Sequence, residues 1–469
     1  MHADAAPAAA PGTPPLWVPQ RSLRRVLGIV FGLAVVIGGV IGSGIMRAPG
    51  VVALGLHSVP LTLGLWAVMG GVAMVTAMPL VEAGAAVPRA GGSYPIATRA
   101  FGPTAGFVTG WLTWLQYTAS NAFISVVFAE YVHRLGLAGG LSNTLLAVGL
   151  ILTMTCVNLT ATRISGGSQS VASAIKGLAF LVVAAVLFVS PKAPLGFHPS
   201  APAAPLLIGA AAVSAIVMAV RVIYQTYAGW DAAIYFSEEV EAPERNVARA
   251  TFLGIGLVTV VYLLVNAALF HVLTPAQIAG SQLAVGDAVR VSMGKTGDTV
   301  VTAIGAISLA AIVNLQIMAS SRITWRMAAD GVLPRFLAGV AKGGAPWRSV
   351  AAVALVSTLF TASGSYEAIV RIYAPWSIGS ILMICLSSFW LRIREPELKR
   401  PYRAPLFPLI TLFACAVQAA LIAVVVADDP ASGAWSALVV VLPIPFFLWF
   451  TRGRRDAIMA AERSAGDKD

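Results

Sequence analysis

Residues 37–50 read IGGVIGSGIMRAPG, an apolar run with Gly42-Ser43-Gly44 at its centre and with Arg47 and Pro49 beyond it. A helix that only anchored the chain would not need these glycines, since each interior glycine costs about 1 kcal/mol of helix propensity relative to alanine. The run therefore predicts either a kink that packing absorbs or a functional break in a helix.

The composition around this stretch is that of an integral membrane protein. The 469 residues are 58% hydrophobic and 11% charged, with a mean hydropathy of +0.82, whereas soluble domains carry about 25% charged residues. The chain contains about twelve apolar runs, most of them long enough to cross ~30 Å of hydrocarbon as helices. Their pattern is not the short alternation of an outer-membrane barrel. The expected spans are residues 25–54, 60–83, 103–132, 142–162, 169–190, 205–238, 251–273, 299–327, 349–362, 367–391, 405–427 and 433–450.

The net charge of +11 follows the expected membrane topology. Basic clusters precede the first span and follow several even-numbered spans, whereas the opposite loops carry few basic residues. Because loops rich in lysine and arginine stay in the cytoplasm, we expect a multi-pass protein with both termini cytoplasmic. The basic charge therefore does not indicate nucleic-acid binding.

No pattern of an enzyme or of a metal site stands out. The GKT at 294–296 imitates the end of a phosphate loop, but Val289 stands where the first glycine should be. The three cysteines, Cys156, Cys385 and Cys415, are isolated within apolar spans, so they predict no metal cluster and suggest no disulfide-linked partner. We expect no enzymatic activity, no cofactor and no metal, and a partner subunit is not expected although the sequence leaves it open.

A second break lies in the sixth span, AVRVIYQTYAGWDAAIYFSEE, at Ala228-Gly229. Spans one and six begin two sets of five, which predicts an inverted repeat whose first helices are discontinuous near the bilayer midplane. The alternative is a pair of glycine kinks without function.

The expected division of the chain is a disordered cytoplasmic N-terminus at 1–20, repeats at 21–200 and 201–395, helices 11 and 12 at 396–452, and a cytoplasmic tail at 453–469.

Paired breaks are suited to a zwitterionic ligand. Unwinding frees backbone N–H groups at the start of the following half-helix, where the helix dipole is positive, and frees carbonyls at the end of the preceding one. A carboxylate needs the donors and an ammonium needs the acceptors. Lipid-exposed unwound backbone would be costly, so the breaks should line a cavity enclosed by protein.

Four ordered motifs resemble those of the amino acid–polyamine–organocation superfamily. They are IGSGI at 41–45, TYAGWDAAIYFSEEVEAPERNVARA at 226–250, ASSRITWRMAADGVLP at 319–334 and WLRIREPELKRPYRAPLFP at 390–408. The second motif is most similar to the L-amino acid transporter branch and its bacterial relatives. The resemblance implies the LeuT fold, alternating access, an amino acid substrate and a bacterial cytoplasmic (inner) membrane.

The resemblance also implies positions for a substrate. The amides of Ser43, Gly44 and Ile45 would hold its carboxylate, and the carbonyls of Val40, Gln225 and Ala228 would hold its ammonium. Tyr227 and Trp230 would shape or gate the side-chain pocket. Gln225 departs from the family pattern, because relatives usually place an aromatic gate there. Helix breaks would fall at Gly42, Gly44, Ala228 and Gly229.

Charged residues within the spans are functional candidates, because a charge at membrane depth is costly. Lys176 would, by the resemblance, take the place of a bound sodium ion. If burial lowered its pKa toward neutrality it could also carry a coupled proton; alternatively it snorkels to the cytoplasmic face. Arg47 and Arg221 could attract an anionic side chain, but a simpler interpretation pairs each with a carboxylate such as Glu130. Asp231 could meet a basic substrate group, take a proton, or cap the following half-helix.

Polar faces mark the third span, at Gln116, Tyr117 and Ser120, and the eighth span, at Asn314 and Gln316. Such faces often only join helices, and Asn314 is the preferred pocket candidate among them.

The leading hypothesis is a sodium-independent exchanger or proton-coupled transporter of small L-amino acids or derivatives. The alternatives are a polyamine or cationic amino acid transporter, and less readily a channel. The side chain carried, exchange versus symport, direction, oligomeric state and the roles of the two arginines stay open.

Overall fold

The computed structural model describes residues 27–159, 162–194, 210–279, 281, 283–341, 343–363, 366–454 and 458–459. The N-terminal segment expected to be disordered, 1–20, and most of the C-terminal tail, 453–469, lie outside these ranges. Within them the chain is built from helices, apart from an isolated backbone bridge between Leu27 and Val240.

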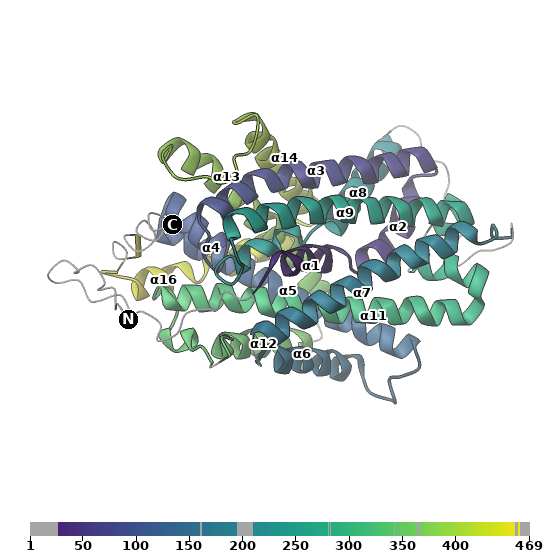
Figure 1. The fold of residues 1–469 in the computed structure, drawn as a ribbon, viewed down its shortest axis with the longest axis horizontal. Coiled ribbons are helices and arrows are strands. Elements are labelled where there is room, and N and C mark those ends of the chain that lie inside the picture. Colours follow the sequence, from purple (N-terminus) through teal and green to yellow (C-terminus); the bar gives the residue numbers. More distant parts are fainter. Residues whose placement is uncertain are drawn as a thin grey trace.

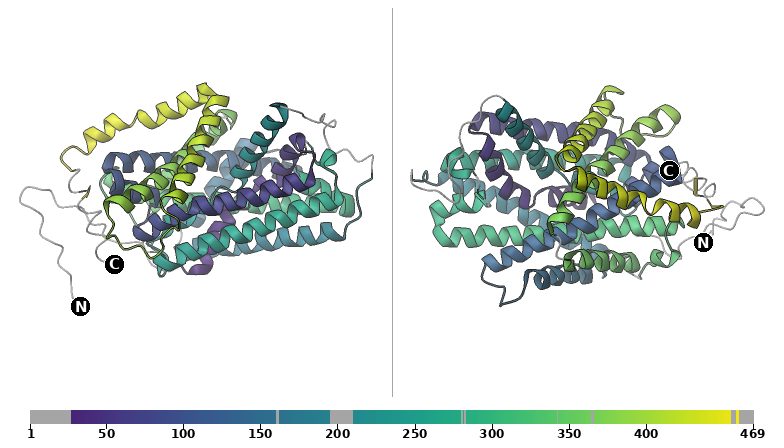
Figure 2. Two further views of the ribbon diagram at one scale, coloured as in Figure 1. Left: turned by 90° about the horizontal axis from the view of Figure 1, so that it is seen from above. Right: turned by 180° about the vertical axis from the view of Figure 1, so that it is seen from behind.

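The helices run mostly along one axis and form an elongated bundle (Figure 1). Figure 2 shows α14 to α16, in yellow-green to yellow, on the face turned away from the viewer in Figure 1. The α-helices are α1 (Ile29–Val40), α2 (Ser43–Gly55), α3 (Val59–Ala86), α4 (Ser93–Phe101), α5 (Pro103–Arg134), α6 (Asn143–Leu159), α7 (Thr162–Val189), α8 (Ala210–Thr226), α9 (Pro243–Val272), α10 (Pro275–Ile278), α11 (Ala284–Ala329), α12 (Trp347–Ala362), α13 (Tyr366–Arg394), α14 (Leu409–Asp428), α15 (Pro430–Val441) and α16 (Ile444–Phe450). Two 3-10 helices are η1 (Trp230–Phe236) and η2 (Arg335–Ala338).

The prediction of an all-helical membrane protein is confirmed at this level. Eight helical segments in the described part are long and apolar enough to cross a membrane, and the first of them, Ile29–Gly55, runs through both α1 and α2. The shorter apolar helices α6 and α12 add to this set. The total of twelve spans and the inverted repeat stay predictions. Of the cysteines, Cys156 is exposed on α6, Cys415 is half-buried and Cys385 is buried, and all three are free thiols.

The two helices predicted to break are interrupted at the glycine-rich positions. The first helix ends at Val40, where Ile41 turns to extended backbone, and α2 starts at Ser43 after extended Gly42. The sixth ends at Thr226, and η1 begins at Trp230 after Gly229, whose φ is +107°. Glycine is the residue that adopts such a φ without steric cost. Ile41 and Gly42 at the first interruption are buried, and Ala228 and Gly229 at the second are half-buried, in agreement with the expectation that protein encloses unwound backbone.

We name the two ends of the bundle by their helices. The α4 end carries α4 and α16, on the left of Figure 1, and the α8 end carries α2 and α8, on the right. Helix α1 packs in the middle against α7, α9 and η1, and most of its side chains are buried. The interrupted helices are therefore the core elements around which the longer helices are arranged.

Candidate functional site

The two breaks touch each other through glycine backbones. A Cβ built on Gly39 would lie 2.8 Å from the carbonyl oxygen of Gly229, and one built on Gly229 would lie 2.7 Å from that of Gly39. Real Cβ contacts are not this short, so neither position accepts a side chain without movement of backbone. Close backbone approach is thus the physical reason for glycine at both breaks.

Carbonyl groups freed at the end of α1 are hydrogen-bonded by two buried side chains. Lys176, on α7 and 1% exposed, donates from Nζ to the carbonyls of Gly38 at 2.8 Å and Ile41 at 2.6 Å. The Tyr262 hydroxyl, on α9, lies 2.8 Å from the Val40 carbonyl and 3.1 Å from that of Thr226. Lys176 therefore does not snorkel to an end of the bundle, and Tyr262 bridges both breaks.

The start of α2 leaves its backbone donors without a side-chain cap. Gly42 is the N-cap and makes no capping hydrogen bond, and the first turn contains no acidic residue. The first N–H groups of a helix need a partner, and the positive end of the dipole favours an anion. Gly44 in this turn faces Thr226, since a Cβ there would lie 2.9 Å from the Thr226 methyl carbon. An anion is therefore the kind of group that the start of α2 can accept.

A cavity of about 340 Å³ lies beside both breaks. Its volume is within the range of small-molecule sites. Arg47, which lines it, has a side chain that is 33% exposed, so the cavity reaches the surface toward the α8 end. The lining comes from seven elements: Gly39 and Val40 of α1; Gly44, Arg47, Ala48 and Val51 of α2; Gln116, Tyr117, Ser120, Phe123 and Ile124 of α5; Val222, Gln225 and Thr226 of α8; Asp231 of η1; Ile312 and Gln316 of α11; Tyr373, Ser377 and Ile381 of α13; and Gly42, Ala228 and Gly229 at the breaks.

Polar side chains of the cavity are partly engaged across helices. Gln316 donates from Nε2 to the Ser120 hydroxyl at 2.9 Å, and the side-chain oxygen Oε1 of Gln116 accepts from the Ser380 hydroxyl at 3.0 Å. The side-chain oxygen Oε1 of Gln316 is buried and has no hydrogen-bond partner among the described residues. It is therefore an acceptor available to a polar ligand.

Some of the residues predicted to bind the substrate line the cavity, and others do not. Val40, Gly44, Gln225 and Ala228 line it, as do the break glycines Gly42 and Gly229. Ile45 is buried but lies outside the lining, and the Ser43 side chain is outside the described part.

Three other candidates pack into the protein instead. The Tyr227 hydroxyl donates to the Trp66 carbonyl at 3.0 Å, away from the cavity lining. Trp230 is 2% exposed and is likewise absent from that lining. The Asn314 side chain of α11 joins α6 and α7: it accepts from the Asn158 side chain at 2.8 Å and donates to the side-chain oxygen of Gln169 at 3.0 Å.

The two arginines of the α8 end are both paired with carboxylates, as the simpler interpretation predicted. Arg47 lies 3.1 Å from Glu130, and Arg221 lies 2.8 Å from Asp428. Both pairs are substantially exposed, which limits their contribution to stability to about 0–1 kcal/mol. The first pair leaves little net charge beside the cavity, whereas Arg221 and Asp428 line a separate pocket.

The α4 end is closed by ion pairs that are more deeply buried. Arg322 of α11 binds Glu239 with two hydrogen bonds, of 2.7 and 2.9 Å, and the two side chains are 1% and 0% exposed. The Leu27 amide donates to the Glu239 carbonyl at 3.0 Å, which attaches the segment before α1 to the segment after η1. No continuation of the cavity lining reaches these residues.

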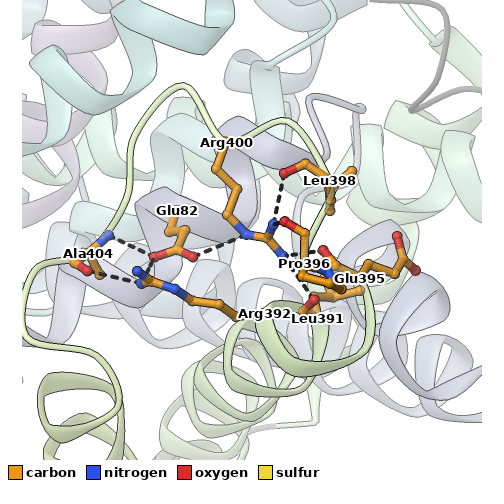
Figure 3. A network of polar contacts seen from close by, with 8 residues as sticks. All are labelled: Glu82, Leu391, Arg392, Glu395, Pro396, Leu398, Arg400 and Ala404. Atoms are coloured by element: carbon orange, nitrogen blue, oxygen red, sulfur yellow. Dashed lines mark hydrogen bonds and ion pairs between the residues drawn. The ribbon is translucent and has the colours of Figure 1, made fainter.

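A second buried carboxylate attaches the loop after α13 to α3. Glu82 accepts from Arg392 at 2.9 Å and from the Ala404 amide at 2.7 Å, and it lies 3.3 Å from Arg400 (Figure 3). Arg400 also donates to the carbonyls of Leu391, Glu395, Pro396 and Leu398. The arginine-rich motif at 390–408 therefore folds onto one glutamate of α3.

Sequence reasoning missed two residues of this arrangement, Tyr262 and Glu82. Glu82 is the one charged residue of α3, and Tyr262 lies within an apolar stretch of α9; a polar group at membrane depth is a signal worth following. The partners of Tyr262 and Glu82 are 222 and 322 residues away in some of these bonds, so the sequence offered no local partner.

The comparisons with known proteins agree on one family. A family model described as amino acid permease matches residues 27–448. The chain is 28% identical to the b(0,+)-type amino acid transporter 1 of Mus musculus, over 90% of this chain and 86% of the relative. It is 27% identical to the Asc-type amino acid transporter 1 of Mus musculus, over 83% of this chain and 75% of the relative. It is 28% identical to the large neutral amino acids transporter small subunit 2 of Rattus norvegicus, over 83% of this chain and 74% of the relative.

Proposed function

Because the chain belongs to the amino acid permease family, we propose that it is a secondary active transporter of small L-amino acids or their derivatives. It would work by alternating access, independently of sodium, either as an exchanger or coupled to protons. The proposed location is a bacterial cytoplasmic membrane, with the α4 end on the cytoplasmic side. The names of the relatives refer to amino acid transporters, which supports the substrate class.

The observation that carries this proposal is the backbone chemistry beside the cavity. The uncapped start of α2 would offer amide donors, and the carbonyls of Gln225 and Ala228, two residues that line the cavity, would offer acceptors. Together they would supply both groups that an α-amino acid needs. Glycines at 39 and 229 hold the two breaks close enough for one ligand to reach both.

Lys176 supports the sodium-independent part of the proposal. Its ammonium already occupies a position between two carbonyls of the first break, at 2.6 and 2.8 Å. A cation in an enclosed site of carbonyl oxygens would be expected to bind there if the lysine were absent, because hard cations take oxygen ligands. The fixed charge of Lys176 would make a sodium ion unnecessary.

The two ends of the bundle support alternating access. The cavity reaches the surface at the α8 end beside Arg47, while the buried Arg322–Glu239 pair closes the α4 end. This is the arrangement of a transporter that receives its substrate from the α8 side. Transport would require the α8 end to close and the pairs of the α4 end to separate.

Counterflow in proteoliposomes would test the function. Vesicles containing the purified protein are loaded with a mixture of radiolabelled amino acids, and single unlabelled amino acids are added outside without sodium. We expect a narrow set of amino acids to trigger saturable release, and Gly39→Ala to abolish it. The matched control is Gly64→Ala on α3, where an added Cβ meets nothing within 4 Å. Release that does not saturate would indicate a channel instead.

A further inference from the structure

Asp231 is a carboxylate inside the cavity whose charge has no basic partner. It is 2% exposed and lines the cavity two residues after the second break. The Tyr235 hydroxyl donates to its Oδ2 at 3.3 Å. Among the described residues, no lysine or arginine lies within ion-pair distance of it.

The groups around Asp231 are tyrosines from four elements. Tyr235 of η1 donates to it, Tyr117 of α5 and Tyr373 of α13 line the same cavity, and Tyr224 of α8 is buried with its hydroxyl accepting from Gln418. Their hydroxyl groups can donate to a carboxylate or accept from a carboxylic acid. They contribute no positive charge to neutralise Asp231.

The nearby cations are engaged elsewhere. Arg47 lines the cavity but pairs with Glu130, and Lys176 donates to the carbonyls of Gly38 and Ile41. An ionised carboxylate without a cation is costly to bury, so such groups take up a proton or bind a positive charge. At Asp231 that charge must come from what enters the cavity.

We propose that Asp231 is a cation subsite of the cavity, occupied by a proton when the substrate is neutral and by the basic side chain when the substrate is cationic. The inference rests on the proposed amino acid transport and deepens it by naming two substrate classes. A neutral amino acid would travel with one proton bound to Asp231. A lysine-like amino acid would travel without that proton, because its side-chain ammonium takes the same place.

The geometry of the breaks explains why one molecule can use both sites. Asp231 is on the same short segment as Gly229, whose backbone contacts Gly39 of the first break. The α-amino and α-carboxyl groups would bind at the breaks, and a side chain extending over η1 would reach Asp231. The side-chain amides of Gln116 and Gln316, which also line the cavity, carry no charge.

Proteoliposomes that enclose a pH-sensitive dye test the proposal through the ratio of two substrates. For the wild type, we expect alanine uptake to be driven by an inward proton gradient and to carry protons, and lysine uptake to carry none. In Asp231→Asn, the ratio of lysine to alanine counterflow should fall about tenfold or more, the loss of roughly one charged contact, and the proton gradient should no longer drive alanine accumulation. Asp231→Glu should retain lysine uptake.

Asp287→Asn is the matched control. Asp287 is also a buried aspartate, but it accepts from Ser281 at the start of α11, outside the cavity lining. Its substitution should leave the lysine-to-alanine ratio and the proton coupling unchanged. An unchanged ratio in Asp231→Asn, with proton-driven alanine uptake retained, would overturn the proposal.

A wild-type measurement covers the case in which Asp231→Asn does not fold. Protons and lysine should compete, so the KM for lysine should rise as the pH on the uptake side falls, whereas the KM for alanine should not rise. A lysine KM independent of pH would overturn the inference while alanine counterflow still supports the proposed function. Absence of counterflow with every amino acid would instead refute the proposed function itself.

Discussion

Replacing Glu239 by glutamine removes one charge from an ion pair whose two side chains are 0% and 1% exposed. Arg322 would keep a positive charge in a buried site, with a weak interaction over the Phe236 ring at 5.6 Å and hydrogen bonds to the Met318 carbonyl and the Ser321 hydroxyl. Breaking a buried pair by neutralising one partner costs about 3–5 kcal/mol. We expect the closed α4 end to lose stabilisation of that size.

The loss converts into a shift of the conformational equilibrium. If the pair exists only while the α4 end is closed, about 3–5 kcal/mol corresponds to roughly two to three and a half orders of magnitude in the ratio of open to closed molecules. A cysteine at Ser237, a position 1% exposed in the closed end, would report this ratio on a background from which the native cysteines have been removed. The rate of its labelling by a membrane-impermeant maleimide should rise about 100-fold or more.

A double variant separates the charge from the packing. Glu239→Leu combined with Arg322→Met replaces both charges by apolar groups, which in buried pairs is often neutral or stabilising. We expect its thermal unfolding to return toward that of the wild type, above that of Glu239→Gln. Equal unfolding temperatures and equal labelling rates in Glu239→Gln and wild type would refute the view that this pair holds the α4 end closed.

Three further substitutions test the breaks and the loop contact. Gly229→Ala should abolish counterflow, because a Cβ there would lie 2.7 Å from the Gly39 carbonyl on a backbone at φ +107°, whereas Gly71→Ala on α3, where nothing lies within 4 Å, should not change it. Lys176→Met should lower the free energy of unfolding by about 2–6 kcal/mol, the cost of two buried carbonyls left without donors, and a thermal melt in detergent would measure it. Glu82→Gln should increase proteolysis in the loop at 395–408, since it removes the charge that binds two arginines and one amide; an unchanged digestion pattern would contradict this.

The breaks could be predicted from the sequence because their cause is local. A glycine-rich stretch interrupts a helix through the propensities of its own residues, and IGSGI and YAGWD each contain their signal within five positions. The apolar runs likewise indicate helices by length alone. Lys176 could be singled out because a lysine in such a run is costly wherever it points.

The partners of polar side chains could not be predicted in the same way. Asn314 and Gln316 are two residues apart on α11, and of the two the sequence favours Asn314 as the residue that faces the pocket. In the structure Asn314 joins α6 and α7, and Gln316 lines the cavity. Which of the two faces the ligand depends on how α11 is rotated against its neighbours, and that rotation is decided by packing over the whole bundle.

The charges at the two ends differ in burial, and this difference has an energetic consequence. At the α8 end the side chains of Arg221 and Asp428 are 33% and 62% exposed. Separating or re-forming such an exposed ion pair requires little free energy. The pair of Arg322 and Glu239 at the α4 end is buried, and opening must hydrate both charges while giving up their mutual attraction. Closure of the α8 end around a substrate should therefore require less free energy than opening of the α4 end, and it should come first. Binding energy gained at the breaks would then be available to separate the buried pair.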